Sequence, residues 1–180
     1  MVATGELTHS RLFFALWPDE AARQRIVVLA EQFHRRYGGR RVATPSLHIT
    51  LAFLGNTLDT RVPALQGLAR ELDAAAFDLT LGFAGAWNKG VFWLAPQETP
   101  AELTHLVVQL HHQLREAGIP FANQSFAPHL TLMRSAKYAD GPMPIEPIEL
   151  KVEDFVLVRT VFVAGGVRHD ALARFPLQRS

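Results

Sequence analysis

Two segments of the chain carry the same pattern of histidine, an apolar residue, threonine and leucine. They span residues 48–51 and 129–132, so equivalent positions are 81 residues apart (129 − 48 = 81). Histidine exchanges a proton near neutral pH more readily than other side chains. Two histidines can act as an acid–base pair when one enters protonated and the other neutral. The repeated pattern therefore suits in-line displacement at phosphorus, where one group activates water and the other protonates the departing oxygen.

In a β-strand, each motif places its threonine beside its histidine. Alternate residues face the same side, so His48 shares a face with Thr50, and His129 shares a face with Thr131. A threonine hydroxyl can donate a hydrogen bond to a non-bridging phosphate oxygen. Two such strands facing each other would form one site with two imidazoles and two hydroxyls, able to cleave a phosphodiester without a metal ion. The residues leave open which histidine is the acid.

The elements around the motifs predict an α+β fold. Strands are expected at residues 11–16, 47–54, 77–83 and 91–94, at the second motif, and at 148–163 and 171–177. Helices are expected from Pro18 to Gly38, at 58–72 and at 100–117, the last with an apolar stripe and a capping box formed by Thr99 and Glu102. Residues 1–10 are expected to be a tail, and 141–147 a proline-rich loop.

The order of these elements repeats, because strand, helix and motif strand occur once in each half. We therefore predict one bilobal domain over residues 1–180 with weak two-fold symmetry. Alternation of polar and apolar residues in the strands favours antiparallel sheets over a doubly wound parallel sheet.

Composition narrows the class of protein. The chain has 180 residues, 48% of them hydrophobic, and a net charge of +1. This content suffices for a sizeable core, and the balanced charge argues against coating nucleic acid by bulk electrostatics. The absence of cysteine excludes disulfides, zinc–thiolate sites and a cysteine nucleophile. No apolar run approaches the ~20 residues that cross a bilayer, so we expect a cytoplasmic protein without a membrane partner.

Other residues allow a functional and a structural interpretation. The cluster Arg35, Arg36, Arg40 and Arg41 could bind an anion or simply form a solvated helix end and loop. Three aromatic residues could stack on bases or belong to the core: Trp87, Phe92 and Trp93. The helix at 100–117 contains three histidines, but their spacing and the lack of an acidic partner argue against a metal site. No Gly-rich phosphate loop appears, which argues against an ATP-driven reaction.

Three stretches resemble the 2H phosphoesterase superfamily, and specifically its RNA 2′,3′-cyclic phosphodiesterase (2′-5′ RNA ligase) family. They read RLFFAL at 11–16, LHITLAFLG at 47–55 and FAPHLTLMR at 126–134. The resemblance covers most of the chain. It implies a bilobal α+β fold with two antiparallel sheets around a central cleft, pseudo-two-fold symmetry and helices on the outside.

The resemblance also implies a reaction. Its substrate would be a 2′,3′-cyclic phosphate on an RNA end or a nucleotide, and its product a 2′-phosphomonoester. His48 would donate a proton to the 3′ oxygen, and His129 would accept one from water. Thr50, Thr131 and Arg134 would bind the substrate. No cofactor, metal or protein partner is implied, the chain is expected to be a monomer, and the reverse reaction would join RNA ends through a 2′-5′ bond.

Three positions qualify the resemblance. Simple alternation places Arg134 on the face opposite His129, so it reaches the cleft only if the strand ends or bulges near Met133. Thr160 and His169 stand where the family often has serine and tyrosine, which affects substrate preference. Two other functions stay open: a related enzyme acting on another small cyclic phosphate or nucleotide derivative, and an RNA-end-binding protein with little turnover.

Overall fold

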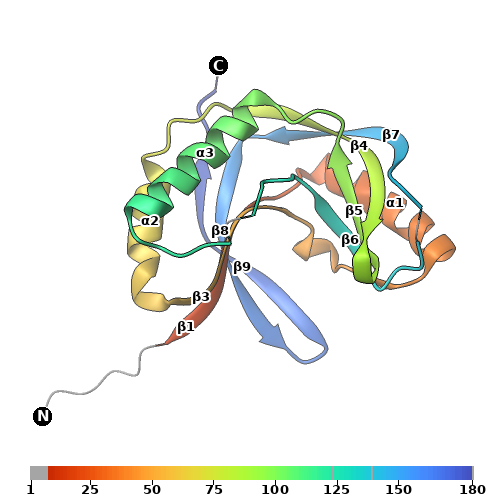
Figure 1. Ribbon diagram of the computed structural model, residues 1–180, viewed down its shortest axis with the longest axis horizontal. Helices are drawn as coiled ribbons and strands as arrows, with labels where there is room; N and C mark the ends of the chain where they lie inside the picture. The colour runs from red at the N-terminus through yellow and green to blue at the C-terminus, as the bar shows by residue number, and fades with distance from the viewer. Residues whose placement is uncertain (1–7, 123, 139, 180) are drawn as a thin grey trace, which may run out of the picture.

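The strands of both motifs lie at the centre of one curled antiparallel sheet (Figure 1). The computed structural model describes residues 8–122, 124–138 and 140–179, and within them nine strands follow the order β7-β4-β5-β6-β3-β1-β8-β9, with β2 on β6. The strands are β1 (His9–Leu16), β2 (Arg40–Arg41), β3 (Ile49–Leu58), β4 (Phe77–Trp87), β5 (Val91–Pro96), β6 (Leu130–Arg134), β7 (Met143–Val152), β8 (Asp154–Val163) and β9 (Gly166–Pro176).

Apart from the two-residue β2, the sheet consists of two halves of four strands each. One half is β7-β4-β5-β6 and the other is β3-β1-β8-β9. The two halves are joined between β3 and β6. In the described residues these two strands share one pair, Ile49 with Leu130. The two sheets expected from the sequence are therefore halves of one hydrogen-bonded sheet, and the α+β class is confirmed.

Helices cover the outside of both halves (Figure 1). Helix α1 (Glu20–Tyr37) contacts β6 and β7, whereas α2 (Val62–Arg70) and α3 (Ala101–Glu116) contact each other and the half that contains β3 and β9. The stripe predicted for the third helix is confirmed as fully buried. It consists of Leu103, Leu106, Val107, Leu110 and Leu114.

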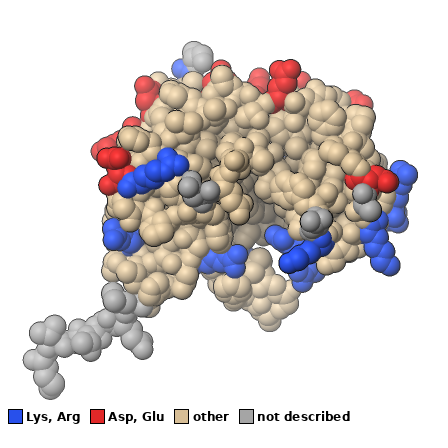
Figure 2. All heavy atoms as spheres, in the orientation of Figure 1, with Lys and Arg blue, Asp and Glu red and all other residues tan. Residues whose placement is uncertain are grey.

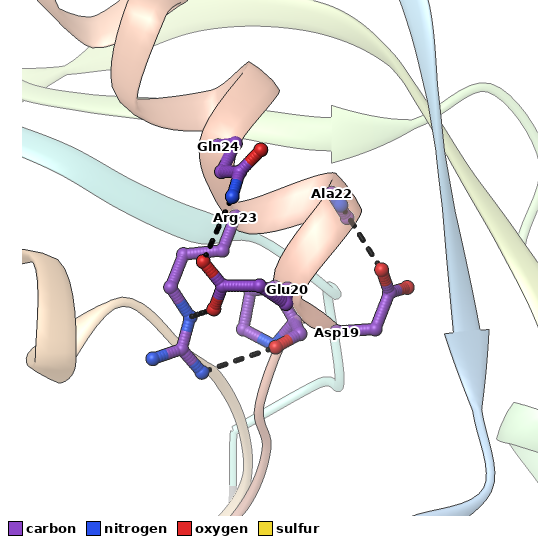
Figure 3. Close-up of polar contacts among 6 residues, drawn as sticks. Asp19, Glu20, Ala22, Arg23 and Gln24 are labelled. Carbon is purple, nitrogen blue, oxygen red and sulfur yellow. Dashed lines mark hydrogen bonds and ion pairs between the residues drawn. The ribbon is translucent and has the colours of Figure 1, made fainter.

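Helix α1 begins at Glu20, two residues after the Pro18 start that the sequence indicates. Asp19 caps the helix, because its side chain accepts a hydrogen bond from the backbone N–H of Ala22 at 3.0 Å (Figure 3). Its other oxygen accepts from the backbone N–H of Lys151 at 2.9 Å, which ties the helix to β7. Glu20 accepts from Gln24 one turn later, at 3.1 Å. The helix ends at Tyr37, and Gly38 and Gly39 after it both have positive φ.

Two expectations for the C-terminal third were wrong. The loop expected at 141–147 ends before Met143, and the single strand expected at 148–163 is two strands that break at Glu153. Ile148, Leu150 and Val152 are buried on even-numbered positions, but the buried run resumes at 155, so the alternation slips at the break. Prolines are accepted in β7 because it lies at the edge of the sheet.

Three smaller expectations also needed correction. Thr99 does not cap α3, since the residue before the helix is Pro100 and no side chain caps it. β3 does not close at Gly55 but continues to Leu58. The expected tail at 1–10 is too long, because β1 begins at His9; residues 1–7 lie outside the described part. None of the described helices has the length and apolar character to cross a membrane.

Candidate active site

The cleft between the two halves has a volume of about 620 Å³ and is lined by all five residues that the sequence indicates. These are His48, Thr50, His129, Thr131 and Arg134. Figure 2 shows a recess on this face with basic side chains at its rim.

The register across the centre of the sheet arranges the two motifs head to tail. Antiparallel partners have a constant sum of residue numbers, and for Ile49 and Leu130 this sum is 179 (49 + 130). The same sum relates His48 to Thr131 and Thr50 to His129. Each histidine is thus aligned with the threonine of the other motif, which brings four polar groups together on the cleft face.

Both motif strands bulge one residue after the threonine. Across β3 and β1 the register moves from Thr50↔Ala15 to Ala52↔Phe14, so Leu51 is the extra residue. Across β6 and β5 it moves from Thr131↔Trp93 to Met133↔Phe92, so Leu132 is the extra residue. A bulge resets the alternation of faces. The two bulges lie at equivalent positions of the repeat (132 − 51 = 81).

The bulge in β6 explains how Arg134 reaches the cleft. Leu132 and Met133 are both fully buried, and the next residue, Arg134, returns to the face of Thr131 and lines the cleft. The condition that the sequence sets for this residue is therefore met. Its equivalent in the other half is Phe53 (134 − 53 = 81), which also lines the cleft.

The carbonyl oxygen of each bulged residue finds a hydrogen-bond donor outside its own pair of strands. The imidazole Nε2 of His111, on α3, lies 2.9 Å from the oxygen of Leu51. The backbone N–H of Val42 donates to the oxygen of Leu132 at 2.8 Å. Since a buried carbonyl without a donor is destabilising, these contacts hold both bulges, and His111 has a structural role that the sequence did not indicate.

A backbone carbonyl two residues earlier orients each motif histidine. Nδ1 of His48 lies 2.7 Å from the oxygen of Ser46, and Nδ1 of His129 lies 2.9 Å from the oxygen of Ala127. A carbonyl can only accept, so Nδ1 carries the proton in both rings and Nε2 is the nitrogen left for chemistry. Nε2 of His48 lies 3.1 Å from the hydroxyl of Thr50, which can donate to it or accept from it.

The surroundings of His48 disfavour its charged form. Burial lowers its pKa to about 4 from 6.5, and the positive charges of His169, His129 and Arg134 add to this effect. The carbonyl of Ser46 acts in the opposite direction. His48 is therefore neutral at pH 7 unless negative charge is brought next to it.

Aromatic rings lie against the imidazoles of both motifs. His48 lies 4.8 Å from Phe13 and 5.2 Å from His169, between ring centroids. His129 lies 4.4 Å from Trp87, edge to face. Of the three aromatic residues that could stack or belong to the core, Trp87 is exposed beside His129, whereas Phe92 and Trp93 are buried.

Further lining residues come from both halves. Thr160 and His169, where the sequence suggests a departure from the family, are cross-strand partners, and both line the cleft. Arg11 also lines it and lies 5.0 Å from the centre of the Phe53 ring. The sequence did not single out Phe53 as a site residue, although its place 81 residues before Arg134 was a usable signal.

The arginine cluster divides between the cleft and the surface. Arg40 and Arg41, on β2, line the cleft, whereas Arg35 and Arg36 lie in the last turn of α1. On α3, His105 lies 3.1 Å from the amide of Gln109. Within residues 8–122, 124–138 and 140–179, no three histidine or acidic side chains converge as a metal site would require.

Comparisons with known proteins agree with this geometry. A family model described as the 2′-5′ RNA ligase superfamily matches residues 17–161. The RNA 2′,3′-cyclic phosphodiesterase of Escherichia coli K12 is 35% identical over 169 residues, covering 93% of this chain and 96% of that protein. An enzyme of the same name from Archaeoglobus fulgidus is 28% identical over 178 residues, with 92% and 99% coverage.

Solved structures show the same likeness. The crystal structure of E. coli LigT complexed with 3′-AMP matches with a TM-score of 0.85 and 34% identity, over 94% of this chain and 98% of that one. A structure described as a phosphoesterase matches with a TM-score of 0.86 and 34% identity, with the same coverage. The family model covers most of the chain, and the E. coli relative agrees with it in sequence and in fold over nearly its whole length. The chain therefore belongs to the 2′-5′ RNA ligase superfamily.

Proposed function

We propose that this protein hydrolyses 2′,3′-cyclic phosphodiester ends of RNA, or 2′,3′-cyclic nucleotides, to 2′-phosphomonoesters. The observation that carries the proposal is the pairing of Ile49 with Leu130, which brings two His-x-Thr motifs together in one cleft. The relatives named RNA 2′,3′-cyclic phosphodiesterase support the same substrate. The reaction needs no nucleotide cofactor.

In the proposed reaction, Nε2 of His129 takes a proton from water as the water oxygen attacks phosphorus. The bond from phosphorus to the 3′ oxygen breaks, and Nε2–H of His48 protonates that oxygen. The products are a 2′-phosphomonoester and a free 3′ hydroxyl. Thr50, Thr131 and Arg134 hold the phosphate, whose negative charge grows in the transition state. Proton exchange with water then restores both histidines.

The charge state of His48 sets a requirement for this assignment. A pKa of about 4 leaves the ring neutral at pH 7, whereas an acid must enter protonated. A phosphate anion bound beside the ring stabilises the imidazolium and raises the pKa. In this scheme, the substrate's own phosphate therefore brings the acid into its working form.

The decisive experiment incubates the protein with 2′,3′-cyclic AMP and with a short RNA that ends in a 2′,3′-cyclic phosphate, in EDTA. A 2′-phosphate product supports both the reaction and its independence from metal ions. A 3′-phosphate product would contradict the assignment of the leaving oxygen. Absence of product from both substrates would refute the hydrolase and favour the RNA-end-binding alternative.

Several finer expectations remain predictions. They are the reverse 2′-5′ ligation, a monomeric state and a cytoplasmic location. Reverse ligation is checked by mixing RNA with a 5′ hydroxyl and RNA with a cyclic end at high concentration, and sedimentation checks the oligomeric state.

A further inference from the structure

The hairpin of β8 and β9 lines the cleft with residues that the proposed reaction does not use, and none of them is a lysine, an arginine or a carboxylate. Thr160 is the cross-strand partner of His169, and Phe162 is the partner of Val167. Cross-strand partners share a face, as do residues two apart in a strand. All four residues line the cleft, so a continuous strip runs from the neighbourhood of His48 to the tip of the hairpin.

The tip of this hairpin is unusually apolar for an exposed segment. Phe162 is 70% exposed, and Val163 and Val167 are each 42% exposed. The hairpin extends away from the rest of the sheet (Figure 1), so its apolar side chains are not covered by other elements. A planar ring in water at the rim of a phosphate site is suited to stack on a nucleobase.

The opposite wall of the cleft is basic. Arg40 and Arg134 are cross-strand partners on β2 and β6, and both line the cleft. Arg41 beside them is 3.3 Å from the carboxylate of Glu31, but no described carboxylate forms an ion pair with Arg40 or Arg134. Like charges directly opposite each other destabilise a sheet, and a bound phosphate chain would neutralise them.

We infer that the cleft binds an RNA end in one orientation, with the terminal nucleobase stacked on Phe162 and the upstream phosphates at Arg40. The inference rests on the proposed function. In a 2′,3′-cyclic end, the base leaves the ribose at C1′ and the chain leaves at C5′. When the cyclic phosphate lies between His48 and His129, these two substituents reach different walls of the cleft.

Phe162 and Arg40 would contribute to binding through different interactions. Every base has a flat face, so stacking tolerates all four bases and strengthens with the size of the ring system. The contribution of Arg40 depends on charge and therefore weakens with salt. A cyclic mononucleotide has the base but lacks the upstream phosphates, which allows the two contributions to be measured separately.

The test of the base site is a binding experiment that does not require turnover. Calorimetry compares 2′-AMP with inorganic phosphate on the wild type, on Phe162→Ala and on Val163→Ala. Val163 is the control, because it is an exposed apolar residue of the same hairpin tip and does not line the cleft. We expect Phe162→Ala to raise the Kd of 2′-AMP by about 5-fold or more and to leave the Kd of phosphate unchanged.

Two results would overturn the base site. One is an unchanged Kd of 2′-AMP in Phe162→Ala. The other is an equal loss of affinity for 2′-AMP and phosphate, which would indicate a disturbed phosphate site. Failure of the proposed function is distinguishable, because it appears as a wild type that binds 2′-AMP through Phe162 without turning over either cyclic substrate.

The test of the chain site uses Arg40→Gln and, as its control, Arg70→Gln at the end of α2. We expect Arg40→Gln to raise the KM for a short RNA with a cyclic end more than the KM for 2′,3′-cyclic AMP. The variant should also flatten the dependence of the RNA KM on salt, because one phosphate contact is lost. Equal effects on RNA and mononucleotide would contradict the orientation.

Discussion

Ile49 and Leu130, which are 81 residues apart in the chain, are direct partners at the centre of the sheet. The residues on either side of this pair are the histidine and threonine of each motif. The position of the pair therefore determines the relative placement of four polar groups. If the register between β3 and β6 slipped by one residue, the polar side chains of one motif would face the core while those of the other faced the cleft. The site therefore depends on this register.

The two motif histidines should be indispensable for turnover but not for folding. We expect His48→Ala and His129→Ala each to lower kcat for 2′,3′-cyclic AMP by at least about 100-fold, the lower range for general acid–base groups. His112→Ala, an exposed histidine on α3, is the control. Circular dichroism should show unchanged folding. Near wild-type turnover in either motif variant would remove the two-histidine mechanism.

The low pKa of His48 should make the protein sensitive to acid. A folded-state pKa of about 4 against 6.5 means that this group contributes stability above about pH 6.5, which is lost as the pH falls toward 4. We expect urea unfolding to show a smaller loss of stability between pH 7 and pH 4.5 in His48→Gln than in the wild type. A parallel loss in both proteins would contradict the lowered pKa.

The two threonine hydroxyls should act on the phosphate and not on the fold. Thr50→Val and Thr131→Val keep the shape of the side chain and remove the donor. We expect each to lower kcat by about 10- to 100-fold, toward the lower range for loss of one oxyanion donor. Thr104→Val on α3 is the control, because its hydroxyl contacts only the backbone of its own helix start at 3.3 Å. Full activity in both motif variants would assign phosphate binding to other groups.

His111 should stabilise the strand that carries the first motif. His111→Leu leaves the carbonyl of Leu51 without its donor, and Leu51 is only 2% exposed. We expect a loss of about 1–3 kcal/mol in the free energy of unfolding and a partial recovery in His111→Gln, whose amide can donate. His112→Leu, the neighbouring exposed position, should change stability little. If the two leucine variants were equally stable, the bulge would not depend on this contact.

Alanine variants of the two adjacent glycines after α1 distinguish the cost of backbone strain from the cost of a steric contact with β6. Gly38 and Gly39 both have positive φ, but only an added Cβ on Gly39 would meet backbone, at 2.7 Å from the oxygen of Arg134. We expect Gly38→Ala to cost about 1–3 kcal/mol from backbone strain alone, because Gly38 has φ 65° and ψ −149°, and Gly39→Ala to cost more. Gly39→Ala should also raise the KM, because it displaces the strand that places Arg134. Thermal unfolding and kinetics of both variants check this pair.

The sequence indicates which residues share the cleft more directly than it indicates the path of every strand. The residues of the motifs and their equal spacing were sufficient to indicate two histidines and two threonines that the structure brings together in one cleft; their catalytic roles stay predictions. The path of the chain after residue 141 was not predictable in the same way, since a strand with two prolines is acceptable only at a sheet edge. Edge position is a property of the assembled sheet, as is the bulge that brings Arg134 into the cleft.

The equivalence of Phe53 and Arg134 has a further consequence. A dimer of two identical half-length chains could build the same centre, with one histidine, one threonine and one bulge from each copy. Such a dimer would carry the same residue at both equivalent positions. A continuous chain is free of that restriction, so one side can be aromatic and the other cationic. A substrate whose two ends differ can then enter in only one direction, which two identical halves could not enforce.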